Sequence, residues 1–243
     1  YVTISSAGGA NDFGDLSQAK DFGAACNSNV RGIYGGGQNG SGAYLTEIDS
    51  VIIQSTGQAT KFGDLTQARL GFGAGSSPTR AVFGGGSESP LNNLLLIDFI
   101  EIETGGTAVK FGELSVGRHY VSGISNSTRA LFAGGVTPTT VNTIDFITIA
   151  TTGNATDFGD LSELIGYLGG LSNQTRGLIC GGNGPSSPTN TNQIEYITIA
   201  SKGNAAEFGD LSGNSKTGTA TGSTTRGVFA LGNVAPVDVD TLE

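Results

Sequence analysis

The chain has 243 residues and a formal net charge of −9 at pH 7, with 41 glycines and neither Trp nor Met. Its 12 lysines and arginines are scattered singly, which argues against nucleic acid, whose phosphate backbone is bound by clustered basic residues. No apolar run approaches the roughly 18–20 residues that a membrane helix requires, so we expect no membrane insertion. The glycines punctuate short apolar runs, a pattern typical of many short strands separated by tight turns.

A short strand-like stretch opens each of five successive units. These stretches are YVTI at 1–4, SVII at 50–53, FIEI at 99–102, FITI at 146–149 and YITI at 196–199. The units that they open span 1–49, 50–98, 99–145, 146–195 and 196–243. Repeats of about 40–50 residues with strand patterning are typical of β-propeller blades. The sequence therefore predicts a single domain over residues 1–243 that is built from five repeats.

Three further strands are predicted in each unit, in the following chain order. Phe-Gly-Asp/Glu-Leu recurs at 13–16, 62–65, 111–114, 158–161 and 208–211. We expect the Phe of each copy to fill the gap between neighbouring blades. A stretch of small residues follows, such as FGAAC at 22–26, and then a run that opens with Arg and closes with Gly, such as RGIYGGG at 31–37. Five copies also exclude a kinase-type Asp-Phe-Gly motif, which is a single magnesium site. No segment has a helical period, so the fold should be all-β.

The repeats resemble the kelch family in two respects. A diglycine or a close relative ends the Arg-led strand at 35–37, 84–86, 134–135 and 181–182, and a basic residue follows the Phe-Gly strand at Lys20, Arg69, Arg118 and Lys216. The chain departs from the family because Phe replaces the usual Trp and the two aromatics lie farther apart. Residues 142–161, NTIDFITIATTGNATDFGDL, also resemble glycine-rich kelch-like repeats in tail and fibre proteins of bacteriophages, especially marine ones. This resemblance implies a five-bladed kelch-like β-propeller with four antiparallel strands per blade.

The two ends of the chain predict how such a ring closes. Residues 240–243, DTLE, joined to residues 1–4, YVTI, read like QIEYITI at 193–199. We therefore expect N- and C-terminal strands to share one blade, with the inner two strands from the C-terminus and the outer ones from the N-terminus. Such a clasp covers strand edges that otherwise promote aggregation. The chain begins with Tyr1, which indicates a processed chain or a segment of a longer protein.

Length variation is confined to one connection of the repeat. The spacing from the opening position of each unit to the arginine is 30 residues in all five units. The variable connections are 38–47, 87–96, 136–143, 183–193 and 233–241. A constant scaffold with variable loops is typical of recognition, although surface loops also drift without a function. The candidate ligand-binding residues are Asn39, Tyr44, Asn92, Asn142, Asn190 and Asn192.

Two recurring acids are expected on the same face as these loops. One set is Asp15, Asp64, Glu113, Asp160 and Asp210, and the other is Asp49, Asp98, Asp145, Glu195 and Glu243. The recurring basic residues would offset four of the repeats, but the fourth has Ile165 and an additional Glu163. Asp160, Glu163 and Glu195 are therefore weak candidates for a cation site. We favour carboxylates that cap turns by accepting backbone N–H bonds, and we predict neither a metal nor any other cofactor.

The remaining polar residues point to no catalytic centre. The recurring arginines are Arg31, Arg80, Arg129, Arg176 and Arg226, and each is expected to bond carbonyls of its own blade. His119 is expected at the surface or in packing, and Cys26 and Cys180 are either a disulfide or two buried thiols. Copper oxidases that use kelch propellers need clustered His, Tyr and Cys ligands. A single histidine argues against that enzyme class.

The function predicted from these features is non-enzymatic. We expect a structural or recognition module of a bacteriophage virion, such as a tail fibre, spike or decoration protein. Its partners would be a host-surface glycan or protein, or another virion protein in a larger assembly, and its location would be virion or extracellular. The alternative is a secreted or cell-surface lectin-like kelch propeller that mediates adhesion. Aromatic platforms in the loops would favour that alternative, and Tyr44 is the one loop aromatic available.

Overall fold

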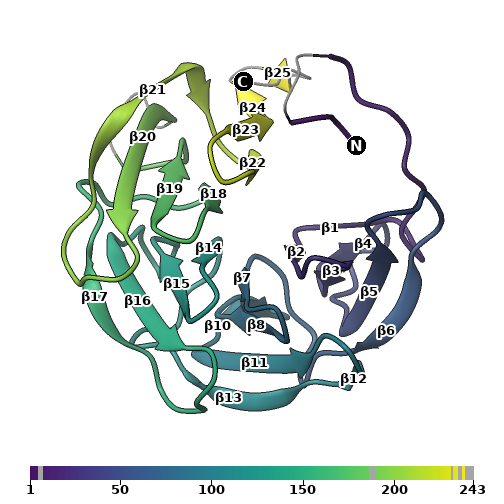
Figure 1. The fold of residues 1–243 in the computed structure, drawn as a ribbon. Helices are drawn as coiled ribbons and strands as arrows, with labels where there is room; N and C mark the ends of the chain where they lie inside the picture. The colour runs from purple at the N-terminus through teal and green to yellow at the C-terminus, as the bar shows by residue number, and fades with distance from the viewer. Residues whose placement is uncertain (5–7, 186–189, 231, 235–236, 239–243) are drawn as a thin grey trace.

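The structure is a computed structural model that describes residues 1–4, 8–185, 190–230, 232–234 and 237–238. Over these residues the chain is all-β, which confirms the predicted fold class. The same residues contain no helix long and apolar enough to cross a membrane. Figure 1 shows the sheets following one another in chain order around a central space.

Repeats one to four each supply most of one four-stranded antiparallel sheet. The first consists of β2 (Ala24–Asn27), β3 (Arg31–Gly35), β5 (Glu47–Ile52) and β6 (Thr60–Asp64). The second consists of β7 (Gly73–Ser76), β8 (Arg80–Gly84), β11 (Leu96–Glu101) and β13 (Val109–Glu113). The third consists of β14 (Ser122–Ser125), β15 (Arg129–Ala133), β16 (Thr143–Thr148) and β17 (Thr156–Asp160). The fourth consists of β18 (Gly169–Ser172), β19 (Arg176–Cys180), β20 (Thr191–Thr198) and β21 (Ala206–Ser215).

Shorter strands complete the described part of the chain. Three antiparallel pairs are β1 (Lys20–Asp21) with β4 (Gln38–Asn39), β9 (Ser87–Glu88) with β10 (Asn92–Asn93), and β24 (Asn233–Val234) with β25 (Val237–Asp238). β12 (Gly106–Thr107) pairs in parallel with β6 and extends the first sheet. The fifth repeat contributes the hairpin of β22 (Thr219–Gly222) and β23 (Gly227–Ala230).

The predicted clasp between the two ends is not formed by the described residues. Residues 1–4 and 11–16, expected as the outer strands of the fifth sheet, have no strand conformation. β23 therefore pairs only with β22. Residues 240–243, which would form the first half of the expected joined strand, lie outside the described residues. Without a third strand beside β23, residues 13–16 lack the partner that β6, β13, β17 and β21 have in the other sheets.

The inner strands need small residues because they pack closely on one another. β2, β7, β14, β18 and β22 are the innermost strands in Figure 1, and each lies against the next in this order. A Cβ on Gly123 in β14 would overlap backbone atoms of Ala74 in β7. Even an alanine side chain at Gly123 would therefore push β7 and β14 apart, which explains why glycine stands at this position.

The apolar core lies between neighbouring sheets. Phe83 of the second sheet packs in one cluster with Ile33 and Ile48 of the first. The recurring Phe of the Phe-Gly strand is buried as predicted at Phe111 and Phe158, each 3% exposed, and burial of such a ring stabilises the fold by about 1.5–3 kcal/mol. The prediction is wrong for Phe208, which is 54% exposed. It lies on the outer strand of the fourth sheet, beyond which no further strand of the described chain is paired.

Candidate ligand-binding site

The variable connections begin beside the segments that lead into the inner strands. Lys20 and Asp21 pair with Asn39 and Gln38, as β1 with β4. The later repeats form single bridges at the same place, and these are Leu70 to Ser87, His119 to Val136 and Gly166 to Asn183. Four loops therefore start next to the entrance of the central space. Of the predicted loops, residues 186–189 of the fourth lie outside the described residues, as do 235–236 and 239–241 of the fifth.

Four of the predicted asparagines shape or anchor their own loops. The Oδ1 atom of Asn39 accepts hydrogen bonds from the amide of Ser41 at 3.1 Å and from that of Ala43 at 3.0 Å. The Nδ2 atoms of Asn142 and Asn192 lie 3.4 Å from the carbonyl oxygens of Leu161 and Leu211. Asn190 is buried, and its Oδ1 accepts a hydrogen bond of 3.0 Å from Asn183.

The other two predicted residues are placed differently. Asn92 is exposed and donates to Glu88 Oε1 at 3.2 Å. Tyr44 is half-buried and forms a β-bridge with Gln38. The six candidates thus stand in four different loops, and Asn92 is the one whose side chain is exposed.

The recurring acids of β5, β11, β16 and β20 are buried, and those of the first three sheets form salt bridges. A β-bulge precedes the acid in every four-stranded sheet, between Ile48 and Asp49, Ile97 and Asp98, Ile144 and Asp145, and Ile194 and Glu195. The salt bridges of these acids join Lys20 to Asp49 at 2.9 Å, Arg69 to Asp98 at 3.1 Å and Arg118 to Asp145 at 2.9 Å. The predicted pairing with the recurring basic residues is confirmed for these three repeats.

The same acids cap the turn after each Phe-Gly strand, as predicted. Backbone amides of Ser17, Thr66, Ser115 and Ser162 donate to Asp49, Asp98, Asp145 and Glu195, respectively. Burial alone would raise the pKa of Asp49, but the adjacent Lys20 ammonium and the hydrogen bonds from Ser17 hold it below its ordinary value. These carboxylates hold the segments that lead into the inner strands.

The fourth and fifth repeats depart from this pairing. Glu195 is 4% exposed, and the buried Ile165 stands at the position that a basic residue has in the first three repeats, while Glu163 is exposed and Asp160 half-buried. No group of three or more His, Cys, Asp or Glu side chains placed to hold a metal occurs among the described residues. In the fifth repeat Ser215, not the expected Lys216, takes the position of the cation. Its carbonyl accepts the amide of Gly182, as that of Arg118 accepts Gly86.

The recurring arginines join neighbouring sheets. Arg80 donates to the carbonyls of Ile149 and Ala150 at 3.2 and 3.0 Å, and Arg129 donates to those of Ile199 and Ala200 at 2.9 Å each. The expected carbonyl partners are therefore present, but they belong to the next sheet and not to the arginine's own. Within its own sheet, each guanidinium instead lies over an aromatic ring. The guanidinium carbon of Arg80 is 4.7 Å from the ring centre of Phe99, and that of Arg129 is 5.0 Å from the ring centre of Phe146. These arginines act as structural links between sheets.

Three aromatic side chains gather at the entrance of the central space. Tyr120 and Tyr167 stack with ring centres 3.8 Å apart and an angle of 24° between their planes. Phe22 meets Tyr120 edge to face at 5.8 Å. These rings were not among the predicted site residues. The signal was nonetheless in the sequence, because Phe22, Tyr120 and Tyr167 each lie nine residues after the Phe of the Phe-Gly strand.

This position has the same backbone conformation in all five repeats. Its φ angles are +52° at Phe22, +66° at Gly71, +52° at Tyr120, +61° at Tyr167 and +58° at Thr217. Backbone hydrogen bonds link successive copies, from Gly71 N to Phe22 O at 2.8 Å, Tyr167 N to Tyr120 O at 3.2 Å and Thr217 N to Tyr167 O at 3.0 Å. A left-handed conformation of a non-glycine residue costs about 1–3 kcal/mol. The fold therefore sets this conformation, and glycine would adopt it most easily.

Tyr120, which contacts both other rings of the cluster, is uncharged near neutral pH. Burial and the neighbouring Tyr167 raise the pKa of Tyr120 to about 12, so its phenol keeps its proton. Burial lowers the pKa of His119, whose Nδ1 lies 2.6 Å from Asn93 Oδ1 and whose ring centre lies 4.5 Å from that of Tyr120. His119 therefore packs behind the cluster, as predicted. The exposed Asp21 is the one acid that borders the adjoining cavity.

A cavity of about 540 Å³ lies beside this cluster, along the inner strands of all five repeats. Its lining combines Phe22, Tyr120 and Tyr167 with hydroxyl groups of Ser122 and Thr219. The described lining contains no Lys, Arg or His. Such a site offers ring faces, hydroxyl groups and one carboxylate, which suits binding of an uncharged polar molecule.

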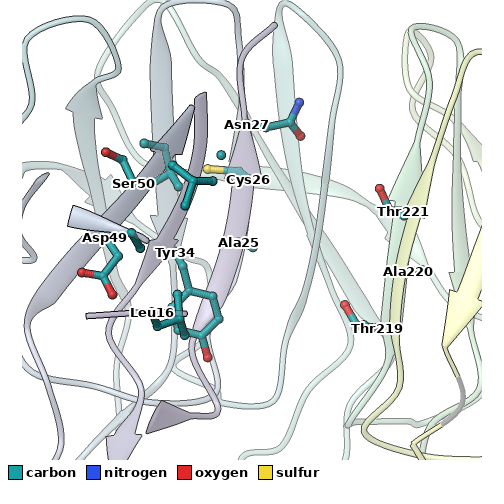
Figure 2. Close-up of a pocket in the computed structure, with 14 residues that line it drawn as sticks. Leu16, Ala25, Cys26, Asn27, Tyr34, Asp49, Ser50, Thr219, Ala220 and Thr221 are labelled. Carbon is teal, nitrogen blue, oxygen red and sulfur yellow. The ribbon is translucent and has the colours of Figure 1, made fainter. Parts of the chain in front are cut away.

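A second cavity of about 380 Å³ separates the first sheet from β22. Figure 2 shows Cys26 and Tyr34 on one of its walls, with Thr219 and Thr221 on the other. Cys26 and Cys180 are both free, and burial raises the pKa of each thiol to about 12. The structure thus supports two protonated thiols and not a disulfide.

Comparison of the chain with known protein families finds no family whose model matches it, and comparison with curated proteins finds no matching relative.

Proposed function

We propose that the chain is a five-bladed kelch-like β-propeller, whose fifth blade forms when residues 1–4 pair with β23. Support comes from a hydrogen bond that recurs between successive repeats. The amides of Ala59, Ala108, Ala155 and Ala205 donate to the carbonyls of Asp15, Asp64, Glu113 and Asp160, all at 2.7–2.8 Å. In the fifth copy the corresponding groups are Ala10 and Asp210.

Two contacts of the N-terminal segment agree with this closure. The bond from Ala59 to Asp15 already holds the N-terminal Phe-Gly segment against the first sheet. Arg226, which directly precedes β23, donates to the carbonyl of Ile4 at 3.0 Å, although 222 residues separate them. The N-terminal segment therefore bridges the first and fifth repeats, as the clasp requires.

Hydrogen exchange tests the closure. In a closed ring, amides in peptides that cover residues 1–4 exchange as slowly as those that cover 196–199, because both stretches would lie between two strands. Peptides that cover 206–210 are also protected, because residues 8–10 would cover them. Complete exchange of residues 1–4 within seconds contradicts the clasp.

We propose further that this propeller is a non-enzymatic recognition module of a bacteriophage virion. It would bind a host-surface glycan or another virion protein through the face that carries the variable loops. The observation that carries this proposal is the common position of four length-variable loops, each beginning beside a segment that leads to the axial entrance. The resemblance of residues 142–161 to phage tail and fibre repeats supplies the virion setting.

The second candidate is a secreted or cell-surface lectin-like propeller that mediates adhesion. The sequence offered one loop aromatic, Tyr44, in its favour. The cluster of Phe22, Tyr120 and Tyr167 at the loop face now gives it a specific basis, because aromatic rings beside hydroxyl groups suit sugar binding. Both candidates use the same face, and they differ in the particle or surface that carries the chain.

A paired-variant experiment tests the loop face. Leu91 is 62% exposed at the tip of loop 87–96, and Val109 is 58% exposed on β13. Val109 lies at the opposite end of this outer strand from Glu113, the residue that pairs near the loops. We expect the double variant Leu91→Asn/Asn92→Ala to weaken capture on a glycan array, or attachment to host cells, by at least about fivefold. Val109→Asn should leave both unchanged.

The assignment of the loop face is wrong if Val109→Asn weakens binding and the loop variant does not. Mass spectrometry of purified virions, with immunogold labelling of the chain, separates the virion setting from the secreted alternative. Detection only in the culture medium favours the lectin-like propeller.

A further inference from the structure

We infer that the aromatic cluster at the axial entrance, formed by Phe22, Tyr120 and Tyr167, binds one pyranose ring of an uncharged glycan. This inference deepens the proposed recognition function and rests on it for the glycan class. It assigns the contact to the centre of the loop face, whereas the loops would hold the remainder of the glycan. Asp21 and nearby hydroxyl groups would orient the sugar.

The rings are not needed to build the fold at this position. Gly71 and Thr217 occupy the same place in the second and fifth repeats, with φ angles of +66° and +58°. The backbone amides of both also donate to the preceding copy. An aromatic residue is disfavoured by this conformation and contributes nothing to these bonds. Three aromatic residues at five such positions therefore call for a reason other than backbone structure.

Packing alone does not supply that reason. Phe22 lines the cavity, and 41% of this residue is exposed. Tyr120 and Tyr167 are half-buried, and each covers only one face of the other. An exposed cluster of rings beside a concave polar surface is typical of a ligand site.

The chemistry of the lining selects a sugar over other ring-shaped ligands. The apolar C–H face of a pyranose packs against an aromatic ring, while its hydroxyl groups need acceptors and donors around the rim. Asp21, Ser122 and Thr219 provide these groups along the cavity, whereas the hydroxyl of Thr217 already donates to the carbonyl of Lys216 at 2.6 Å. The described lining has no Lys, Arg or His to bind a phosphate or carboxylate, and the chain carries a net charge of −9. Nucleotides and acidic sugars are therefore disfavoured.

The dimensions and surroundings also fit a terminal sugar. The cavity of about 540 Å³ falls within the range of about 300–1,000 Å³ that is common for small-molecule sites. Four variable loops begin next to the segments that carry the cluster, through the bridges from Asp21, Leu70, His119 and Gly166. One sugar at the entrance would therefore place the following sugars over the loops.

Glycine substitutions provide the test, because Gly71 shows that the repeat accepts glycine here. The variants are Tyr120→Gly and Tyr167→Gly, and Thr217→Gly is the matched control at a non-aromatic copy. Binding is measured by saturation-transfer NMR and calorimetry with a panel of neutral methyl pyranosides, with methyl glucuronide and adenosine as acidic and planar aromatic probes. Circular dichroism and thermal melting verify that each variant folds.

We expect at least one neutral pyranoside to bind, with contacts to the tyrosine ring protons. Tyr167→Gly and Tyr120→Gly should each weaken this binding at least tenfold, and Thr217→Gly should change it less than twofold. Tyr167→Phe should retain most of the binding, because the ring face remains. Preferential binding of adenosine or methyl glucuronide would overturn the sugar assignment.

The outcomes also separate this inference from the proposed function. If the protein binds glycans on an array and both tyrosine variants bind as well as wild type, the entrance is not the sugar site, but the recognition module stands. If neither the array nor host cells capture the protein, and no pyranoside binds, both proposals fail. Equal losses in Thr217→Gly and Tyr167→Gly would indicate a general disturbance of the entrance and would also overturn the inference.

Discussion

Replacement of Arg118 by methionine is expected to lower the free energy of unfolding by about 3–5 kcal/mol, because the change leaves a buried charge without its partner. Arg118 and Asp145 are both fully buried and joined at 2.9 Å. The same guanidinium donates to the carbonyls of Gly134 at 2.8 Å and Phe132 at 3.0 Å. Methionine fills a similar volume but leaves these acceptors unsatisfied. Urea denaturation followed by circular dichroism measures the loss.

Two further variants make this result specific. Lys110→Met breaks an ion pair with Glu113 in which the lysine side chain is 58% exposed, and it should cost no more than about 1 kcal/mol. In Arg118→Met/Asp145→Asn the buried negative charge is also removed, while an acceptor for the amide of Ser115 is kept. The double variant should recover part of the stability. If Arg118→Met and Lys110→Met have equal effects, burial of the pair is not what stabilises this junction.

Replacement of Gly123 by alanine is expected to destabilise the protein by about 3 kcal/mol, through overpacking of the inner strands. An added Cβ would overlap the backbone carbonyl and amide of Ala74 on the neighbouring β7. Backbone atoms give way less readily than the end of a side chain, so β7 and β14 would have to separate. For a chain of this size the expected fall in Tm is about 6–12 °C, measured by differential scanning calorimetry.

Gly40 provides the matched control for this steric effect. It lies in the loop between β4 and β5, and an added Cβ would meet no atom within 4 Å. Gly40→Ala should change the stability by less than about 0.5 kcal/mol. Similar losses in both variants would show that glycine content, and not close approach at the centre, determines the effect. An unchanged Tm in Gly123→Ala would contradict the close packing of the inner strands.

Local pattern predicted the strands well because each strand depends on nearby residues. The Arg-led run at 31–37 became β3, and the aromatic stretch of the fourth unit became part of β16. The capping role of the acids was also predictable, since an acid recurs at one offset from each strand. The recurring arginines were harder, because their carbonyl partners lie about 70 residues away, as for Arg129 and Ala200. A sequence offset does not say which sheet a long side chain reaches.

The candidate site shows the same division. The asparagines at 39, 142, 190 and 192 were chosen as polar loop residues, but their side chains hold their own loops in place. The aromatic entrance was overlooked because Phe22, Tyr120 and Tyr167 stand about 50 or 100 residues apart in the chain. Only their shared offset from the Phe-Gly strand indicated that they could meet.

The sequence by itself determined the all-β class, most strand positions and the recurrence of the basic residues that pair with acids in the first three repeats. These properties follow from periodicity, small residues and charges that recur at fixed offsets. Only the tertiary structure decided which sheet each arginine joins, that Ser215 and not Lys216 stands at the cation position of the fifth repeat, and which aromatic rings meet at the central space. Contacts between successive repeats depend on how the sheets pack, and packing places residues from distant parts of the chain together in ways that no single repeat encodes.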